Sequence, residues 1–223
     1  SEISFTFLQF GTGRFLRSFA DLFIHEANRN SKVSQNICVV QSTGSERARQ
    51  LAAGSFHVAV RGLSGGTVVD SVERVESVAR GLAADSEFEA VKEIARNRQL
   101  QAIVSNTTEA GLALDERDSE PGTRFSFPAK LLDVLVERHL SGESGLTILP
   151  CELVDQNAKV ILDLVLKQAE IWKLDPGTVE WIREENQWCS TLVDRIVSAP
   201  PVDHPLLASD PLLSVTEPYA FWA

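Results

Sequence analysis

The chain has 223 residues, of which 43% are hydrophobic and 23% are charged, a composition typical of a globular protein with a sizeable core. Its 21 Lys and Arg residues and 31 Asp and Glu residues give a net charge of −10, which argues against a nucleic-acid partner because such binding requires a basic face. The sequence contains no run of about 18 apolar residues that would predict a membrane span. It also opens without a signal-peptide pattern, so we expect a cytoplasmic protein.

The cysteines and histidines are widely spaced. Cys38, Cys151 and Cys189 are odd in number, which predicts reduced, mostly buried thiols rather than a disulfide framework. The four histidines are equally scattered. Because a zinc site needs closely spaced cysteine and histidine ligands, no structural metal is expected.

The N-terminal segment predicts a strand, a glycine turn, a helix and a second strand. Residues 3–10 are apolar and rich in aromatic and β-branched side chains, which is typical of a strand buried on both faces and ending at Gly11. Apolar residues then recur at i, i+4, i+7 and i+8 and predict one helix over residues 15–28. Residues 37–40 predict the next strand, so we expect a right-handed βαβ unit.

Strand and helix patterns continue to alternate along the chain. A short helix is predicted over residues 45–53, followed by an antiparallel hairpin over 56–63 and 67–69. The later elements are a helix over 88–96, a strand over 102–106, a helix over 128–140, a strand over 146–149, helices over 157–171 and 176–188, and an apolar run over 191–197. This order predicts the α/β class, with a doubly wound, mostly parallel sheet and an inserted β-hairpin.

Residues 199–223 differ from the rest. Pro200, Pro201, Pro205 and Pro211 are expected to break any regular element, and the chain stops inside an aromatic-rich segment. A free terminus is ordinarily polar and frayed. We therefore expect residues 1–198 to form the first domain of a longer protein and residues 199–223 to lead to a further domain.

The most informative motif is Gly11-Thr12-Gly13, between the first predicted strand and helix. The first glycine permits a tight turn, and the second lets the backbone approach a pyrophosphate, which then meets free N–H groups at the start of the helix. Arg14 and Arg17 are expected to supply local positive charge in an acidic protein, and Phe15 is placed with them beside the cofactor. Leu16 replaces the third glycine of G-x-G-x-x-G, so a tight turn with nothing bound is the alternative interpretation.

The end of the second predicted strand bears on which ribose the site accepts. An acid is expected there, about 20 residues after the glycine turn. The strand instead runs into Ser42 and Thr43, and the first acid is Glu46. The two hydroxyls could hold the ribose of NAD, whereas Arg47 or Arg49 could face the 2′-phosphate of NADP. Spacing alone leaves both cofactors open.

Polar residues also follow the strand predicted over 102–106, at the edge where ligands gather in open parallel sheets. Asn106, Thr107 and Glu109 are the candidates to contact cofactor there. Helix capping by threonine and asparagine explains this run equally well.

Two later residues are candidates for catalysis. Asn157 follows the strand predicted over 146–149, where a carboxamide N–H could stabilise negative charge that develops on a substrate oxygen; an N-cap role is the structural alternative. Asp194 stands beside Arg195 in an apolar run, either as a buried ion pair or as a pair that orients a catalytic group.

These segments resemble the long-chain mannitol dehydrogenase family, most closely its branch that reduces tagaturonate to altronate. The stretches that carry the resemblance recur in order along the chain: 9–17, 105–111, 127–131, 150–153, 189–197 and 216–218. The resemblance implies a Rossmann-like dinucleotide-binding domain, NAD as cofactor, and hydride transfer from nicotinamide to the carbonyl of a sugar acid. It places the cofactor at Gly11 and Gly13, the residue that steadies the substrate oxygen at Asn157, and Asp194 close to the active site.

One departure from the family pattern limits this expectation. The family's general acid/base is a lysine in a Lys-x-x-x-x-Asn-x-x-His segment of a helical second domain, and no such segment occurs before Ala223. The chain is therefore expected to bind cofactor, with catalysis completed by its own C-terminal domain beyond this chain. A fructuronate or mannitol-type reductase is the nearer alternative, and a non-catalytic nucleotide-sensing module the alternative of another class. The cation for the substrate carboxylate stays open among Lys130, Arg195 and a residue of the second domain.

Overall fold

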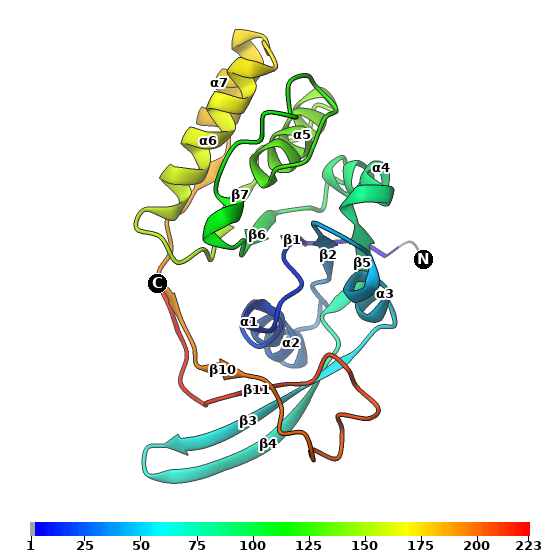
Figure 1. The fold of residues 1–223 in the computed structure, drawn as a ribbon, viewed down its shortest axis with the longest axis vertical. Helices are drawn as coiled ribbons and strands as arrows, with labels where there is room; N and C mark the ends of the chain where they lie inside the picture. The colour runs from blue at the N-terminus through cyan, green and yellow to red at the C-terminus, as the bar shows by residue number, and fades with distance from the viewer. Residues whose placement is uncertain (1–2) are drawn as a thin grey trace.

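The computed structural model describes residues 3–223, which form a six-stranded parallel sheet between helices and a separate four-stranded sheet (Figure 1). The strands of the main sheet are, in chain order, β1 (Phe7–Phe10), β2 (Ile37–Gln41), β5 (Val78–Ala83), β6 (Ala102–Ser105), β7 (Thr147–Pro150) and β8 (Gln187–Trp188). Their order across the sheet is β5-β2-β1-β6-β7-β8, and each neighbouring pair is parallel. The order reverses between β1 and β6, so the carboxyl ends of these two strands border the crevice where such sheets bind ligands.

Helices cover both faces of this sheet because its strands are apolar on both sides. In β2, for example, Cys38 lies in the core on one face and Val39 in the core on the other, and both are 0% exposed. The first face packs against α4 (Ala84–Ala95), α5 (Phe127–Leu140), α6 (Asn157–Ile171) and α7 (Pro176–Glu184), and the second against α2 (Ala20–Arg29) and α3 (Glu46–Ala52). The predicted doubly wound α/β architecture is confirmed.

The sequence pattern gives no signal for β5, because Arg80 and Gly81 interrupt its apolar residues. A Cβ atom at Gly81 would lie 2.1 Å from the carbonyl oxygen of Ala48 in α3. Glycine is therefore required for this helix to pack on the edge strand. The main sheet therefore contains a parallel strand, β5, that the sequence does not predict.

The predicted hairpin is confirmed, but it belongs to the second sheet. Its strands β3 (Phe56–Ser64) and β4 (Thr67–Val75) pair in antiparallel register and project away from the main sheet (Figure 1). On its other side β3 pairs in parallel with β11 (Ser214–Thr216), which in turn pairs with β10 (Val197–Ser198).

The prediction that residues 199–223 contain no regular element is wrong. The four prolines all fall in the loop before β11. No proline lies within residues 214–216, which extend along β3. Beyond β11, β12 (Phe221–Trp222) pairs with β9 (Val193–Asp194). The last part of the chain therefore folds back on the preceding residues.

The single helix predicted over residues 15–28 is two helices, α1 (Arg14–Arg17) and α2, with a break at Ser18 and Phe19. Phe19 has φ −124° and ψ −97°, which is outside the helical region. The carbonyl oxygen of Ser18 accepts a hydrogen bond from Arg195 Nη1 at 2.9 Å, and the Ser18 hydroxyl lies 2.7 Å from that of Ser214. Contacts with the C-terminal segments thus hold the break. The helix predicted over residues 176–188 is also shorter than expected. As α7 it ends at Glu184, because the chain then leads into β8.

Two findings bear on possible partners. Within residues 3–223, no helix combines the length and apolarity that a membrane crossing requires. The same residues include no group of three or more His, Cys, Asp or Glu side chains placed to hold a metal ion.

Cys38 and Cys151 are free and buried as predicted, and burial raises the pKa of both thiols.

Candidate dinucleotide-binding site

The site lies where Gly11, directly after β1, meets Asn106, directly after β6. The amide of Asn106 donates to the carbonyl oxygen of Phe10 at 3.0 Å, which brings the two segments together. Gly11 has φ +131°, and a Cβ atom there would lie 3.0 Å from the backbone oxygen of Asn106, so the position requires glycine. A Cβ atom at Gly13 would meet nothing within 4 Å, so that side of the turn is open.

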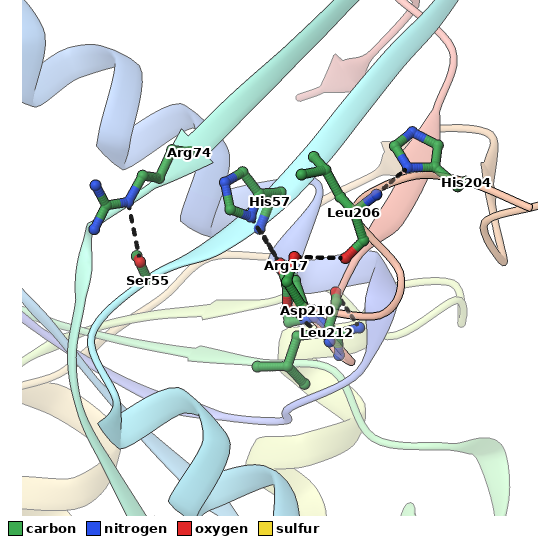
Figure 2. Close-up of polar contacts among 9 residues, drawn as sticks. Arg17, Ser55, His57, Arg74, His204, Leu206, Asp210 and Leu212 are labelled. Carbon is green, nitrogen blue, oxygen red and sulfur yellow. Dashed lines mark hydrogen bonds and ion pairs between the residues drawn. The ribbon is translucent and has the colours of Figure 1, made fainter.

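The two arginines of α1 have different surroundings. Arg14 is exposed beside the turn, where a phosphate could reach it. Arg17 is only 3% exposed, and its guanidinium donates to the carbonyl oxygen of Thr12 at 2.6 Å. The guanidinium also donates to the carbonyl oxygen of Leu212 at 3.0 Å (Figure 2). The prediction that Arg17 supplies charge at the cofactor surface is wrong, because its side chain lies beneath the turn.

Two cavities adjoin the glycine turn, and Asn106 and Thr107 border both. One, of about 390 Å³, lies toward the end of β2, and the other, of about 380 Å³, lies toward the end of β7. The predicted cofactor-binding residues that line them are Gly11, Phe15, Ser42, Thr43, Asn106, Thr107 and Glu109. The structure thus brings together residues that the sequence singled out in three separate segments.

Glu152 connects the ends of β6 and β7 and is not among the predicted site residues. One carboxylate oxygen accepts a hydrogen bond from the Ser105 hydroxyl at 3.1 Å, and the other accepts one from the Thr107 amide at 3.1 Å. The side chain is 3% exposed, and burial raises the pKa of its carboxyl group. Its place two residues after β7, at the same edge of the sheet as the end of β6, is the signal that could have identified it.

A third cavity, of about 560 Å³, continues from Glu152 toward the last residue of the chain. Residues 152–156 form one wall, and residues 190–193 and Ala223 form the other. Leu153 is 82% exposed and Leu192 is 65% exposed at its rim. This side of the site therefore presents apolar side chains to the surface.

Asn157, the first residue of α6, is 0% exposed, and its carboxamide is used within the protein. The amide nitrogen donates to the carbonyl oxygens of Pro150, Glu152 and Thr191 at 3.0–3.2 Å, and the amide oxygen accepts from the Thr191 N–H at 2.9 Å. The N-cap position belongs to Gln156, which has φ +50°. The N-cap alternative does not match this geometry, in which Asn157 fixes the loop after β7 to the segment at Thr191. A contact of Asn157 with a substrate oxygen stays a prediction.

The predicted buried ion pair between Asp194 and Arg195 is wrong. Asp194, the last residue of β9, is exposed rather than buried. Arg195 donates instead to the carbonyl oxygen of Ser18 at 2.9 Å and to the Thr216 hydroxyl at 2.8 Å. Arg195 therefore fastens β11 to the break between α1 and α2.

Two charged side chains lie near the end of β2. Asp85, in the first turn of α4, accepts a hydrogen bond from the Gly44 amide through Oδ2 at 3.0 Å. Lys130 lines the same cavity as Ser42 and Thr43. Its Nζ donates to the carbonyl oxygen of Phe125 at 2.8 Å, and burial lowers the pKa of its amino group. Lys130 thus lies on the β2 side of the crevice.

A parallel sheet of this strand order, with a glycine turn at the point of reversal and cavities on both sides of it, defines a dinucleotide-binding fold of the Rossmann class. Residues 6–223 match the family model described as the mannitol dehydrogenase Rossmann domain. The chain therefore belongs to the mannitol dehydrogenase family, and the resemblance inferred from the sequence is confirmed.

Curated relatives and solved structures agree with this assignment. Altronate oxidoreductase of Bacillus subtilis (strain 168) is 38% identical over 228 residues, which cover 96% of this chain and 48% of that protein. The altronate oxidoreductase of Halalkalibacterium halodurans is 37% identical over 233 residues, 98% of this chain and 46% of that protein. Pseudomonas fluorescens mannitol 2-dehydrogenase, solved with NAD and D-mannitol, shares the fold with a TM-score of 0.83 at 19% identity, over 98% of this chain and 49% of that one. A D-sorbitol dehydrogenase has a TM-score of 0.81 at 21% identity, over 99% and 50%. The chain spans about half the length of the relatives it matches.

Proposed function

We propose that this chain is the NAD-binding part of an oxidoreductase that interconverts the keto sugar acid tagaturonate and the hydroxy acid altronate. The observation that carries the proposal is the convergence of Gly11, Ser42 and Asn106, from the ends of three neighbouring strands, on one cavity at the reversal of strand order. The substrate class is supported by the curated relatives, which are altronate oxidoreductases at 37–38% identity.

The residues at the turn suit a nicotinamide dinucleotide. Gly11 and Gly13 let the backbone approach a diphosphate, because Gly13 leaves open space where a side chain would stand. Arg14 adds an exposed positive charge beside it. On the β7 side, Phe15 and Glu109 line a cavity that can receive the nicotinamide half. The bound cofactor would supply the hydride, and these residues would bind and orient it.

Asp85 favours NAD over NADP in this proposal. Its carboxylate is hydrogen-bonded to the Gly44 amide, so it lies at the turn where the adenosine ribose is expected. A carboxylate there can accept a hydrogen bond from a ribose hydroxyl and repels a 2′-phosphate. Ser42 and Thr43 line the same end of the cavity and add hydroxyl groups.

The proposed roles of Asn157 and Asp194 follow from their positions. Asn157 shapes the third cavity by fixing its two walls to each other through Glu152 and Thr191. Asp194 lies on β9, which pairs with the strand that ends the chain. We assign both residues to the substrate side of the site and assign the proton donor to a second domain of a longer protein.

Titration of the chain with NADH and with NADPH tests the proposal. The ring of Trp222 lies 4.9 Å from that of Phe19, at the break that follows α1, so tryptophan fluorescence reports on this region. We expect saturable quenching by NADH at lower concentrations than by NADPH. The absence of a saturable response to either cofactor would reject the proposal, and tighter binding of NADPH would show that Arg47 or Arg49 contacts a 2′-phosphate.

A further inference from the structure

Three successive carbonyl groups of the glycine turn are held by hydrogen bonds from the protein. The carbonyl oxygen of Gly11 accepts from Gln9 Nε2 at 3.1 Å, and that of Thr12 accepts from Arg17 Nη1 at 2.6 Å. The carbonyl oxygen of Gly13 accepts from the backbone N–H of Arg17 at 3.2 Å. Two side chains, Gln9 and Arg17, therefore fix the two peptide groups on either side of Thr12.

The orientation of these carbonyl groups fixes the orientation of the N–H groups. In a planar trans peptide the C=O and N–H bonds point in opposite directions. The N–H groups of Thr12 and Gly13 must therefore point away from Gln9 and Arg17. The space on the outer side of the turn is open, since a Cβ atom built on Gly13 meets nothing within 4 Å, and Gly11 itself lines the cavity toward β2.

Gln9 and Arg17 are themselves held in place. Gln9 is 0% exposed on β1, and its Nε2 also donates to Oδ2 of Asp21 at 3.2 Å. Arg17 donates through Nη2 to the carbonyl oxygen of Leu212 at 3.0 Å (Figure 2). Burial lowers the pKa of Arg17 to about 10, so the group still carries its proton at neutral pH. A buried charge is energetically costly unless it is hydrogen-bonded. Because breaking these hydrogen bonds would leave the charge uncompensated, the guanidinium stays bound to its two carbonyl partners.

The segment that holds Arg17 is anchored in turn to the second sheet. The Oδ2 atom of Asp210 accepts a hydrogen bond from the backbone N–H of His57 at 2.6 Å. The same atom lies 3.0 Å from Nδ1 of the His57 ring, as Figure 2 shows. The other carboxylate oxygen of Asp210 accepts from the Leu212 amide at 2.9 Å. Hydrogen bonds thus run from β3 through the loop before β11 to Arg17 and the glycine turn.

We propose that Gln9 and Arg17 are positioning residues that aim the amides of Thr12 and Gly13 at the diphosphate of the cofactor. The inference rests on the proposed function, because it concerns how the same site holds NAD. Neither side chain touches the ligand; both act through the backbone. The consequence is that affinity for ligands with a diphosphate depends on Gln9 and Arg17, whereas affinity for adenosine does not.

Two substitutions and a matched control test this inference. Gln9→Met keeps the length of the side chain and removes its donor. Arg17→Met keeps the apolar stem and removes the guanidinium donors. Arg138→Met is the control, because Arg138 is 1% exposed and also donates to backbone carbonyl oxygens, those of Ser144, Ala95, Asn97 and Leu100. For each variant we would measure the unfolding midpoint and the dissociation constants of NADH, ADP-ribose and adenosine.

We expect Arg17→Met and Gln9→Met each to raise the dissociation constants of NADH and ADP-ribose by about tenfold or more. The dissociation constant of adenosine should change by less than about twofold. Arg138→Met should bind all three ligands like the wild type. Wild-type affinity for ADP-ribose in both variants would overturn the inference while leaving the proposed function intact. An equal loss for adenosine, or the same loss in Arg138→Met, would also overturn it, since either result would indicate general destabilisation. Failure of the wild type to bind NADH would reject the proposed function itself. If Arg17→Met does not fold, Gln9→Met alone decides.

Discussion

The Oδ2 atom of Asp85 lies 3.0 Å from the amide nitrogen of Gly44 and accepts its hydrogen bond. The contact ties the first turn of α4, which follows β5, to the turn that follows β2. It forms because β5 is the parallel neighbour of β2, so the carboxyl ends of the two strands lie side by side. An acidic side chain from the first turn of α4 therefore lies beside the end of β2, although the sequence has no acid directly after that strand.

Replacing Asp85 by serine should weaken discrimination between the two nicotinamide cofactors. We expect the ratio of NADPH to NADH affinity to rise by about tenfold, because a carboxylate that repels a 2′-phosphate is removed. The ratio is measured by titrating each variant with NADH and with NADPH and following tryptophan fluorescence. Asp70→Ser is the control, since Asp70 is exposed on the hairpin and its loss changes the net charge equally. An unchanged ratio in Asp85→Ser would exclude Asp85 as a ribose contact.

The sequence allowed most of the residues that line the two cavities at the glycine turn to be predicted. Ser42 and Asn106 could be placed together because parallel strands bring their carboxyl ends to one edge, whatever the side-chain packing. Asp85 could not, because β5 carries Arg80 and Gly81 and shows no strand pattern. Its role depends on a strand pairing that only the folded chain reveals.

The direction of a side chain was harder to predict than its position in the chain. Arg17 falls in the first turn of the expected helix beside Arg14, and spacing treats the two alike. One of the two carbonyl groups that it binds, that of Leu212, is 195 residues away. Asn157 likewise follows a strand as predicted, but its partner Thr191 comes from the segment after β8. Long-range contacts of this kind leave no local pattern.

The buried carboxyl group of Asp21 should make the stability of the fold depend on pH. Burial raises the pKa of Asp21 from 3.8 to about 7, although the hydrogen bond from Gln9 and the charge of Arg17 act to lower it. Between those two values the folded state holds a proton that the unfolded state has released. The contribution of Asp21 to stability should therefore be greatest below about pH 4, fall as pH rises toward 7, and level off above that value.

Asp21→Asn should remove this part of the pH dependence. Within residues 3–223, Asp21 Oδ1 and Gln9 Oε1 are buried without a hydrogen-bond partner, and an asparagine amide could donate to the latter. We expect the variant to be more stable than the wild type at pH 8, by on the order of 4 kcal/mol at most, and similar to it at pH 4. Urea unfolding at the two pH values is the measurement. Equal destabilisation at both would mean that Asp21 is ionised in the folded protein.

The two glycines of the turn should respond differently to alanine. Gly11→Ala should cost about 1–3 kcal/mol of stability, because φ is +131° and the new Cβ atom would press on the backbone oxygen of Asn106. Gly13→Ala should leave the unfolding midpoint nearly unchanged, since its φ is −72° and the space around it is open. Gly13→Ala should nevertheless weaken the binding of NADH, because the added methyl group would occupy the space through which the diphosphate approaches the backbone. Full NADH affinity in a stable Gly13→Ala variant would place the diphosphate elsewhere.

Asn157→Ala separates a structural role from a direct contact with substrate. The carboxamide makes hydrogen bonds to Pro150, Glu152 and Thr191 while 0% exposed, so its loss should destabilise the fold by about 2–3 kcal/mol and loosen the third cavity. Urea unfolding of the chain measures the first effect. The rate of altronate oxidation, followed as NADH absorbance in the longer protein that we propose, measures the second. A wild-type unfolding midpoint combined with a loss of about 10²–10³ in kcat would instead favour the role first predicted from the sequence, in which this amide stabilises the substrate oxygen.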